Sequence, residues 1–296
     1  MRELRSDEPL QRSRTAYLLL LPFFVFFVVF WLVPLLGGLR MSFYSNELYG
    51  PSRFVGGEHY RALLEDPRYF KALRNTALYA TYSIVCILPL AVLLAHLLQA
   101  AWRSVRPVLT FLLLLPALTP PAVLALLFLL VFHGREGLLN QLIVLPLGFK
   151  AVNWLKDPTF ILPALVLQTV WRWTGFITLF ILAGMDGIPR VLYDAARMST
   201  ESRWHLFRAV TYPFLKPVLV FSAVYLLVDA FSLFSGAYVL LGGSGGTGDA
   251  GLVLVSYIYQ QAFTFGKFGT ASAISLSVAP FLLLALALCF LRVRRS

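Results

Sequence analysis

Four long runs without any Asp, Glu, Lys or Arg dominate this sequence. They cover residues 15–39, 75–102, 107–134 and 268–291. Each run is longer than the roughly 20 apolar residues that cross a bilayer. Two further runs, 158–185 and 217–248, are interrupted by one charge each, Arg172 and Asp229. Since a lipid-exposed backbone must satisfy its own hydrogen bonds, we expect an all-α polytopic membrane protein. Its six helices would lie near residues 16–38, 76–100, 107–132, 160–184, 215–240 and 271–291.

The composition supports the same class and argues against others. Residues are 59% hydrophobic and only 13% charged, against about 25% charged in a typical soluble domain. The net charge of +11 fits Lys and Arg in cytoplasmic loops better than nucleic-acid binding. Cys86 and Cys289 are isolated, so they imply neither a disulfide framework nor a metal site. The four histidines are scattered, and we expect no metal.

Both ends of the chain are predicted to lie in the cytoplasm. The first run is too long for a signal peptide and is expected to remain as a span. With six spans the termini share one side, which would carry 14 Lys and Arg residues in short segments, against 10 in longer loops opposite. The domains are therefore 1–15 as a cytoplasmic segment, 16–291 as the membrane domain and 292–296 as a cytoplasmic tail. The short run 137–149 is expected to form an interfacial or outward-facing helix.

A polar loop at 186–213 would then join spans four and five on the cytoplasmic side. Leu192, Ala195, Ala196 and Ser199 follow helical spacing, as do Trp204, Phe207 and Val210. We expect two short amphipathic helices, the second capped by Ser199 or Thr200 and ended by Pro213. Such helices suit either lipid headgroups or a groove on a cytoplasmic partner, and periodicity does not choose between them.

The loop resembles the signature of permease subunits of binding-protein-dependent ABC importers. That signature is Glu-Ala-Ala, three residues, Gly and, further on, an apolar residue, one residue and Leu-Pro. Here it reads Asp194-Ala195-Ala196, Thr200 and Val210-Thr211-Tyr212-Pro213. The segments "FVGGEHYRALLEDPRYFKALRNT" (54–76), "WRWTGFITLFILAGMDGIPRVLYDAA" (171–196) and "VSYIYQQAFTFGKFGTASAISL" (255–276) are similar to the carbohydrate-type branch. Asp194, Thr200 and Tyr212 depart from the usual Glu, Gly and Leu, which leaves the shape of the bend open.

The resemblance, which covers about four-fifths of the chain, implies a type I ABC importer permease fold in a bacterial or archaeal cell membrane. It implies a heterodimer with a second homologous permease, a cytoplasmic ABC ATPase dimer and an extracytoplasmic solute-binding protein. No G-x-x-x-x-G-K-[ST] occurs here, so ATP and Mg would be used by the ATPase, and this chain would carry no cofactor and not be an enzyme. The ATPase-coupling residues would be Asp194, Ala195, Ala196, Thr200, Trp204, Phe207 and Pro213.

Arg172 and Asp229 are the charges expected deep in the membrane. Arg172 precedes Asp186 by 14 residues and Asp229 follows Lys216 by 13, so at about 1.5 Å per residue both lie near the midplane. They suit either a structural ion pair or a solute pathway. The pathway hypothesis adds the neighbours on the same helical faces. It assigns Thr169, Arg172, Trp173, Phe176, Asp229, Ser232 and Leu233. Aromatic and hydrogen-bonding groups suit sugars, and Arg172 equally suits a phosphorylated solute.

The sequence argues against two other functions and against a nucleotide-binding motif. An ion-coupled secondary transporter would use Asp229 and Arg172, but acidic relays in several spans and an internal repeat are lacking. A membrane enzyme would need a clustered catalytic set, which the sequence lacks. Gly243, Gly245 and Gly248 match G-x-G-x-x-G but follow a membrane span, so they predict a flexible loop and no dinucleotide site. By resemblance, this loop contacts the solute-binding protein.

Overall fold

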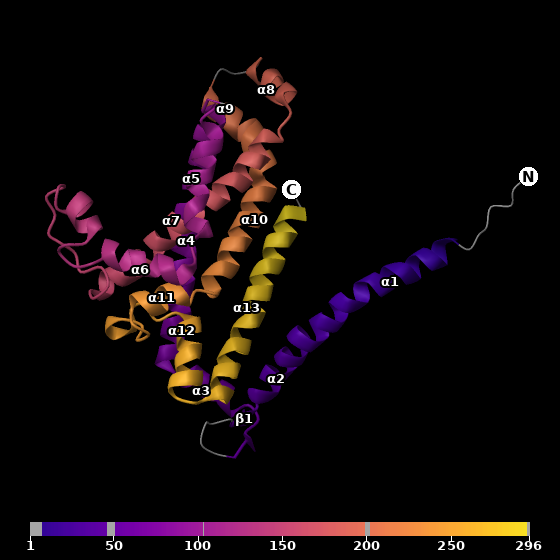
Figure 1. Ribbon diagram of the computed structural model, residues 1–296, viewed down its shortest axis with the longest axis vertical. Coiled ribbons are helices and arrows are strands. Elements are labelled where there is room, and N and C mark those ends of the chain that lie inside the picture. Colours follow the sequence, from indigo (N-terminus) through magenta and orange to yellow (C-terminus); the bar gives the residue numbers. More distant parts are fainter. Residues whose placement is uncertain (1–7, 46–50, 103, 199–201, 295–296) are drawn as a thin grey trace, which may run out of the picture. The chain divides into compact units, whose positions relative to one another are not determined.

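The computed structural model describes residues 8–45, 51–102, 104–198 and 202–294, and almost all of its regular structure is helical (Figure 1). Among these residues, five helical stretches are long and apolar enough to cross a membrane. They are Tyr17–Met41, Pro67–Ala100, Pro158–Asp186, Arg203–Phe231 and Phe268–Ala287. A bent pair, Arg106–Leu118 with Pro121–Val131, makes a sixth if it is counted as one span.

The chain divides into two compact units, of which the first comprises Met1–Leu64 and Gln261–Ser277. Its elements are α1 (Glu8–Phe27), a π-helical turn η1 (Val28–Leu32), α2 (Val33–Met41), the two-residue strands β1 (Tyr44–Ser45) and β2 (Arg53–Phe54), most of α3 (Glu58–Glu65), most of η5 (Gln260–Thr264) and the start of α13 (Phe268–Arg294). The strands pair antiparallel, with Tyr44 opposite Phe54. His59 joins the parts of this unit, since Nε2 lies 3.0 Å from the Tyr44 carbonyl oxygen and Nδ1 3.3 Å from Thr270 Oγ1.

The second unit, Glu65–Gln260 with Val278–Ser296, holds most of the core. Its long helices are α4 (Pro67–Ala100), α5 (Arg106–Leu118), α7 (Pro158–Asp186) and α10 (Tyr212–Phe231). Shorter elements are α6 (Pro121–Val131), η2 (Asn140–Val144), α8 (Arg190–Arg197), α9 (Arg203–Leu206), η3 (Phe207–Thr211), α11 (Ser235–Leu240), η4 (Thr247–Asp249) and α12 (Leu254–Tyr259). Helix α7 packs against α4, α5 and α10, so it is the central helix of this unit.

An Asp-Pro pair starts each of the two central helices. Asp66 precedes α4 and accepts a hydrogen bond from the Arg68 amide at 2.9 Å, and Asp157 does the same for Thr159 before α7. The following proline sits where a helix needs no N–H donor. Helix α4 therefore begins at residue 67, nine residues before the helix expected at 76–100, because the more polar residues 67–75 continue the same helix.

One glycine sets the distance between α5 and α7. A Cβ built on Gly175 would lie 1.7 Å from the Leu113 carbonyl oxygen. Because no side chain fits at that distance, the two backbones can approach this closely only at glycine. Above and below this contact, apolar side chains such as Ile177 and Leu165 are fully buried.

The single helix expected at 107–132 is wrong, because the chain bends by 97° between α5 and α6. The break falls in the sequence Leu118-Thr119-Pro120-Pro121, and Pro120 has an extended ψ of 136°. Two consecutive prolines remove two amide donors, and the first forces its predecessor out of the helical region. Helix α6 then starts afresh with Pro121 in its first turn and packs against α11.

The helix expected at 215–240 is also divided. Helix α10 ends at Phe231, and α11 begins at Ser235 after a non-helical Phe234 with φ −133°. The Ser232 hydroxyl donates to the Val228 carbonyl oxygen at 2.9 Å. This hydroxyl bonds to the carbonyl four residues earlier, at the place where the helical hydrogen bonds stop, and such a bond often bends a helix.

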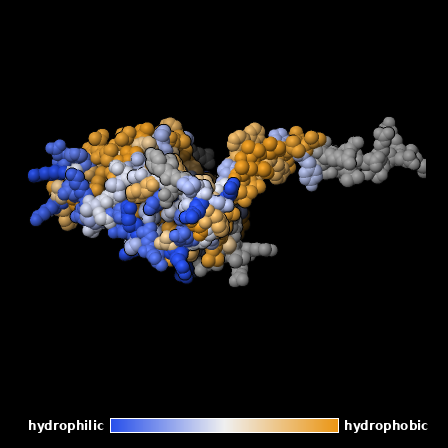
Figure 2. All heavy atoms as spheres, turned by 90° about the horizontal axis from the view of Figure 1, so that it is seen from below, coloured by the Kyte–Doolittle hydropathy of each residue, from blue (hydrophilic) through white to orange (hydrophobic). Residues whose placement is uncertain are grey.

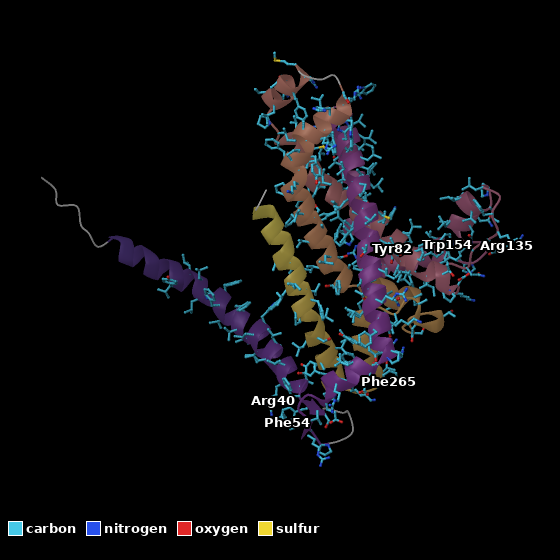
Figure 3. The ribbon with its side chains drawn as sticks, turned by 180° about the vertical axis from the view of Figure 1, so that it is seen from behind. Arg40, Phe54, Tyr82, Arg135, Trp154 and Phe265 are labelled. Carbon is cyan, nitrogen blue, oxygen red and sulfur yellow. The ribbon has the colours of Figure 1, made fainter. Side chains whose placement is uncertain are left out.

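The interfacial helix expected at 137–149 is reduced to one π-helical turn, η2. The buried Asn140 organises this segment instead. Its amide donates to the carbonyl oxygens of Gly134 and Val152, and its Oδ1 accepts from the Val152 amide at 3.1 Å and from Trp154 Nε1 at 3.2 Å. Figure 3 labels Arg135 and Trp154, which lie on the segment that follows α6. The contact of this segment with a membrane interface stays a prediction.

Large apolar side chains are exposed on both units. They include Phe26, Trp31 and Leu35 on the first and Leu93, Leu97 and Phe111 on the second. Figure 2 shows hydrophobic residues spread over much of the viewed face. A soluble monomer rarely exposes such continuous apolar area, whereas lipid-facing helices require it.

Candidate functional site

A cavity of about 180 Å³ lies within the second unit, where the two broken spans meet. Its lining residues come from α4, α6, α7, α10, the break at 232–234 and α11. They are Tyr79, Pro121, Leu124, Gln168, Thr169, Arg172, Trp173, Asp229, Ser232, Leu233, Phe234, Ser235 and Gly236. Six of the seven expected pathway residues are among them. The seventh, Phe176, is absent from the wall.

The cavity sits at the end of α10 and beside the start of α6, so non-helical backbone at membrane depth lines a hollow rather than lipid. This is the setting in which discontinuous membrane helices are tolerated. In membrane transporters, such broken helices commonly form the solute site.

A tryptophan stands between the two membrane charges. Trp173 Nε1 donates a hydrogen bond to Asp229 Oδ2 at 2.7 Å. The Arg172 guanidinium carbon lies 4.7 Å from the centre of the same indole ring, a cation–π distance. Among the described residues Arg172 and Asp229 form no direct ion pair, so the structural ion pair allowed by the sequence is wrong.

The two charges need no direct contact, because the Trp173 indole interacts with both of them. Its N–H satisfies the carboxylate, and its face attracts the guanidinium, so neither charge has to approach the other. One donor is left over: Arg172 Nε is buried and has no hydrogen-bond partner in the described part of the chain. A buried donor without a hydrogen-bond partner costs folding free energy, so it indicates a functional role or a ligand that binds there.

Phe176 supports the site from outside. Its ring centre lies 5.5 Å from Trp173 and 5.5 Å from Tyr225. Tyr225 in turn meets Trp173 edge to face at 5.2 Å. The helical spacing placed Phe176 on the correct side of α7, but its ring packs behind the indole rather than beside the cavity.

Sequence reasoning missed the contributions of α4 and α6. Tyr79 is fully buried, lines the cavity and hydrogen-bonds through its hydroxyl to Thr169 Oγ1. A polar ring inside the apolar run 75–102 was the only local signal. On α11, Gly236 faces Gln168, since a Cβ on it would lie 2.9 Å from Gln168 Oε1. Gly236 follows Asp229 by seven residues, which is helical spacing, although the helix between them is broken.

Chemically, the wall offers balanced hydrogen bonding beside three aromatic rings, those of Tyr79, Trp173 and Phe234. Arg172 donates, Asp229 accepts, and Gln168, Ser232 and Ser235 can do both. Among the described residues no group of three or more His, Cys, Asp or Glu could hold a metal ion. The arrangement suits a polar molecule with several hydroxyls more than bond-breaking chemistry.

The described residues of the second expected set lie on α8, α9, η3 and the start of α10, and α8 and α9 are at the end of the unit opposite α11 and α12 (Figure 1). Asp194 and Arg197 are exposed and 3.6 Å apart. Ala195 is exposed and Ala196 partly so. Trp204 is 69% exposed and stacks on Phe207, with ring centres 5.6 Å apart and planes 18° from parallel. The Tyr193 hydroxyl lies 2.9 Å from Thr211 Oγ1 and ties α8 to η3.

Two expectations about this segment are wrong, and a third concerns a residue outside the described part of the chain. The cap of α9 is Ser202, whose side chain accepts from the His205 amide, and not Ser199 or Thr200. Pro213 does not end the second helix, because Arg203–Phe231 forms one helical stretch. The π-helical turn η3 changes the backbone hydrogen-bond pattern just before Pro213, where the Tyr212 amide donates to the Phe207 carbonyl oxygen. Thr200 itself lies outside the described residues.

Two curated proteins are similar to this chain over nearly its whole length. The arabinooligosaccharides transport system permease protein AraP of Bacillus subtilis (strain 168) is 34% identical over 265 residues, which are 90% of this chain and 84% of AraP. The trehalose/maltose transport system permease protein MalF of Thermococcus litoralis is 30% identical over 293 residues, 99% of this chain and 97% of MalF.

The fold has a solved counterpart. A chain of a bacterial alginate ABC transporter, crystallised with an alginate pentasaccharide-bound periplasmic protein, superposes with a TM-score of 0.83 at 22% identity. The match covers 99% of this chain and 98% of that one. The model of the family "Binding-protein-dependent transport system inner membrane component" matches residues 68–295. The chain is therefore a multi-pass membrane protein with the fold of ABC importer permeases, and it belongs to the family of inner membrane components of binding-protein-dependent transport systems.

Proposed function

We propose that this chain is the permease subunit of an ATP-driven importer for a sugar or a related carbohydrate. An extracytoplasmic solute-binding protein would deliver the solute, and a second, homologous permease would complete the pathway. The names of the curated relatives support the carbohydrate class, since they transport arabinooligosaccharides, trehalose and maltose. The chain would serve transport alone, with ATP and Mg used by a separate ATPase dimer.

The cavity is the observation that carries this proposal. It combines one indole ring, an acceptor at Asp229, a donor at Arg172 and several groups that do both. Sugar rings present apolar C–H faces and a rim of hydroxyls, so they need this mixture of stacking and hydrogen bonding. Thr169, Ser232 and Leu233 would complete the path, while Phe176 would hold Trp173 in place.

A phosphorylated or acidic carbohydrate is the second candidate. The unpartnered Nε of Arg172 supports it, because a guanidinium binds phosphate and carboxylate oxygens well. Asp229 opposes it, since its charge lies on the other side of the same indole. The first candidate solute is neutral and the second carries an anionic group. Uptake of arabinotriose and maltotriose, compared with uptake of glycerol 3-phosphate, would distinguish them.

The exposed end formed by α8 and α9 would dock on the ATPase. Asp194 would pair with a basic residue of the groove, and Trp204 with Phe207 would enter it, as an amphipathic helix does in a groove. Ala195, Ala196 and Pro213 would allow close approach of the backbones. This assignment requires both termini and the 186–213 loop to lie in the cytoplasm, which agrees with the distribution of Lys and Arg.

The decisive test is recovery of the partner chains. The chain would be tagged after Ser296, expressed with its neighbouring transport genes, purified in mild detergent and examined by mass spectrometry. We expect an ATPase and a second permease with the wild type, and loss of the ATPase with Asp194→Arg combined with Trp204→Ala. Arg135→Asp with Phe149→Ala is the matched control, because both residues are exposed on the segment after α6. Recovery of this chain alone from every sample would refute the proposal.

A further inference from the structure

Four polar side chains on one face of α4 hold the glycine-rich loop, residues 241–253, which follows α11. Arg68, Lys71, Asn75 and Thr76 recur at helical spacing, and each bonds to the segment 248–254. These contacts span more than 170 residues of sequence. They replace the flexible loop expected from the glycines with a loop that is fixed at many points.

The strongest of these contacts joins Arg68 to Asp249. Nε of Arg68 donates to Oδ2 at 2.8 Å and a terminal nitrogen donates to Oδ1 at 2.9 Å, so the pair is bidentate. The two side chains are only 39% and 23% exposed. A bidentate, partly shielded pair of this kind is stronger than the usual surface ion pair.

Further along α4, two side chains form hydrogen bonds with the backbone of the loop and of the residue after it. The Asn75 amide donates to the carbonyl oxygens of Asp249 and Leu252 at 2.9 and 3.0 Å, and Thr76 Oγ1 accepts from the Leu254 amide at 3.0 Å. Asp249 has φ of +57°, which is uncommon for a residue other than glycine. Its conformation is therefore set by the contacts on its side chain and its carbonyl.

Arg68 also reaches the start of the loop. The same guanidinium donates to Gln260 Oε1 at 3.2 Å, and Gln260 Nε2 donates to the Gly243 carbonyl oxygen at 2.8 Å. Gly243 lies three residues after the last residue of α11. One arginine thus bonds directly to the end of the loop and, through Gln260, to its beginning.

The loop is joined to the cavity wall through α11. Helix α11 supplies Ser235 and Gly236 to the cavity wall and leads directly into the loop. Gly251 lies so close that an added Cβ would be 2.6 Å from Ile161 of α7 and 2.3 Å from Leu241. The same face of α4 continues to Tyr79, which also lines the cavity. The loop can therefore hardly shift without moving α11.

We propose that Arg68 and Asp249 are positioning residues for the solute cavity: they fix the glycine-rich loop and, through it, the α11 wall. This inference rests on the proposed function for the identity of the cavity as the solute site. It needs no contact between either residue and the solute. Loosening the pair should let α11 move and weaken solute binding, while the rate of turnover at saturating solute stays the same.

Hydrogen exchange of the assembled wild-type transporter and its variants in lipid nanodiscs tests the geometry without any solute. We expect amide exchange of 235–240 to quicken about tenfold in Arg68→Gln and in Asp249→Asn. The double variant should be no faster than either single one, because both remove the same interaction. Arg74→Gln is the matched control, since Arg74 is exposed on the same helix and has no ion pair in the described part of the chain. Faster exchange confined to 242–251, with α11 unchanged, would overturn the proposal.

Uptake into proteoliposomes supplies the second readout, with labelled arabinotriose and maltotriose as probes. Arg68→Gln should raise the apparent KM about tenfold and leave the maximal rate unchanged. A fall in the maximal rate at constant KM would contradict a positioning role. If wild type takes up neither probe, both oligosaccharides are excluded as its solute, whereas the exchange experiment still decides whether Arg68 and Asp249 position α11.

Discussion

The indole nitrogen of Trp173 and the carboxylate of Asp229 lie 2.7 Å apart and join α7 to α10 at membrane depth. Asp229 thereby satisfies one oxygen without an ion pair, and Arg172 is left free to interact with the face of the ring. Hydrogen bonds to charged groups are worth about 1.5–3 kcal/mol. The contact therefore contributes to the packing of the two helices as well as to the shape of the cavity.

Replacing Trp173 by Phe should destabilise the protein by about 1–3 kcal/mol, because Asp229 loses its donor and stays half-buried. Uptake of the carbohydrate probe at low concentration should fall at least tenfold, about 1.4 kcal/mol in binding. Thermal unfolding in detergent and an uptake assay measure the two effects. Asp229→Asn is the companion variant, since its amide oxygen can still accept from the indole. If Trp173→Phe melts and transports like wild type, the contact has no role.

The close approach of α5 and α7 makes a prediction about glycine. Gly175→Ala should destabilise by about 3 kcal/mol or more and reduce yield, because its Cβ would collide with the Leu113 backbone. Gly184→Ala, on the same helix, should cost clearly less. Its Cβ would meet the side chains of Leu215 and Val218 at 3.1 Å, and side chains can adjust where backbone cannot. Unfolding of both variants in the same detergent measures the difference, and equal stability would show that the helices separate at no cost.

Asn140 should be essential to the segment between α6 and α7. Asn140→Ala removes four hydrogen bonds at a fully buried position and leaves backbone groups unsatisfied, each at about 1–3 kcal/mol. We expect limited proteolysis to cut within 132–157 in this variant, with the rest of the chain intact. Gln141→Ala is the control, because Gln141 makes one exposed bond to the Arg135 carbonyl. Equal resistance of both variants to protease would mean that Asn140 does not organise the segment.

The sequence indicated the long apolar helices well, because a membrane requires about 20 apolar residues in each span and composition shows such runs directly. It failed at the breaks. The sequence contains the Pro120-Pro121 pair, but hydropathy gives no sign of the 97° bend there. The residues after the two prolines are as apolar as the residues before them. Ser232 bonds back to the Val228 carbonyl at the end of α10, and composition cannot reveal such a contact.

The cavity was partly predictable for a related reason. Helical spacing from Arg172 and Asp229 found residues on the facing sides of α7 and α10. It could not show that both charges would meet the same indole ring, since that depends on the distance between helices. The bond between Arg68 and Asp249 joins residues 181 positions apart. No local pattern indicates such a pair, so the anchoring of the glycine-rich loop emerges only from the folded chain.

Trp204, which stacks on Phe207 and is exposed, allows a test of the two interpretations of the 186–213 loop. The loop binds either a cytoplasmic partner or lipid headgroups. If the loop docks on an ATPase, Trp204→Ala should weaken the ATPase affinity of the purified permease by about 2 kcal/mol, roughly thirtyfold. The unfolding free energy should stay within about 0.5 kcal/mol of wild type, because the ring is mostly exposed in the chain alone. Binding to the ATPase in nanodiscs, with thermal unfolding alongside, measures both quantities. Trp102→Ala is the matched control, as another exposed tryptophan outside the loop. If instead Trp204 rests on lipid headgroups, the ATPase affinity will not change, and attachment of the helix to anionic vesicles will fall.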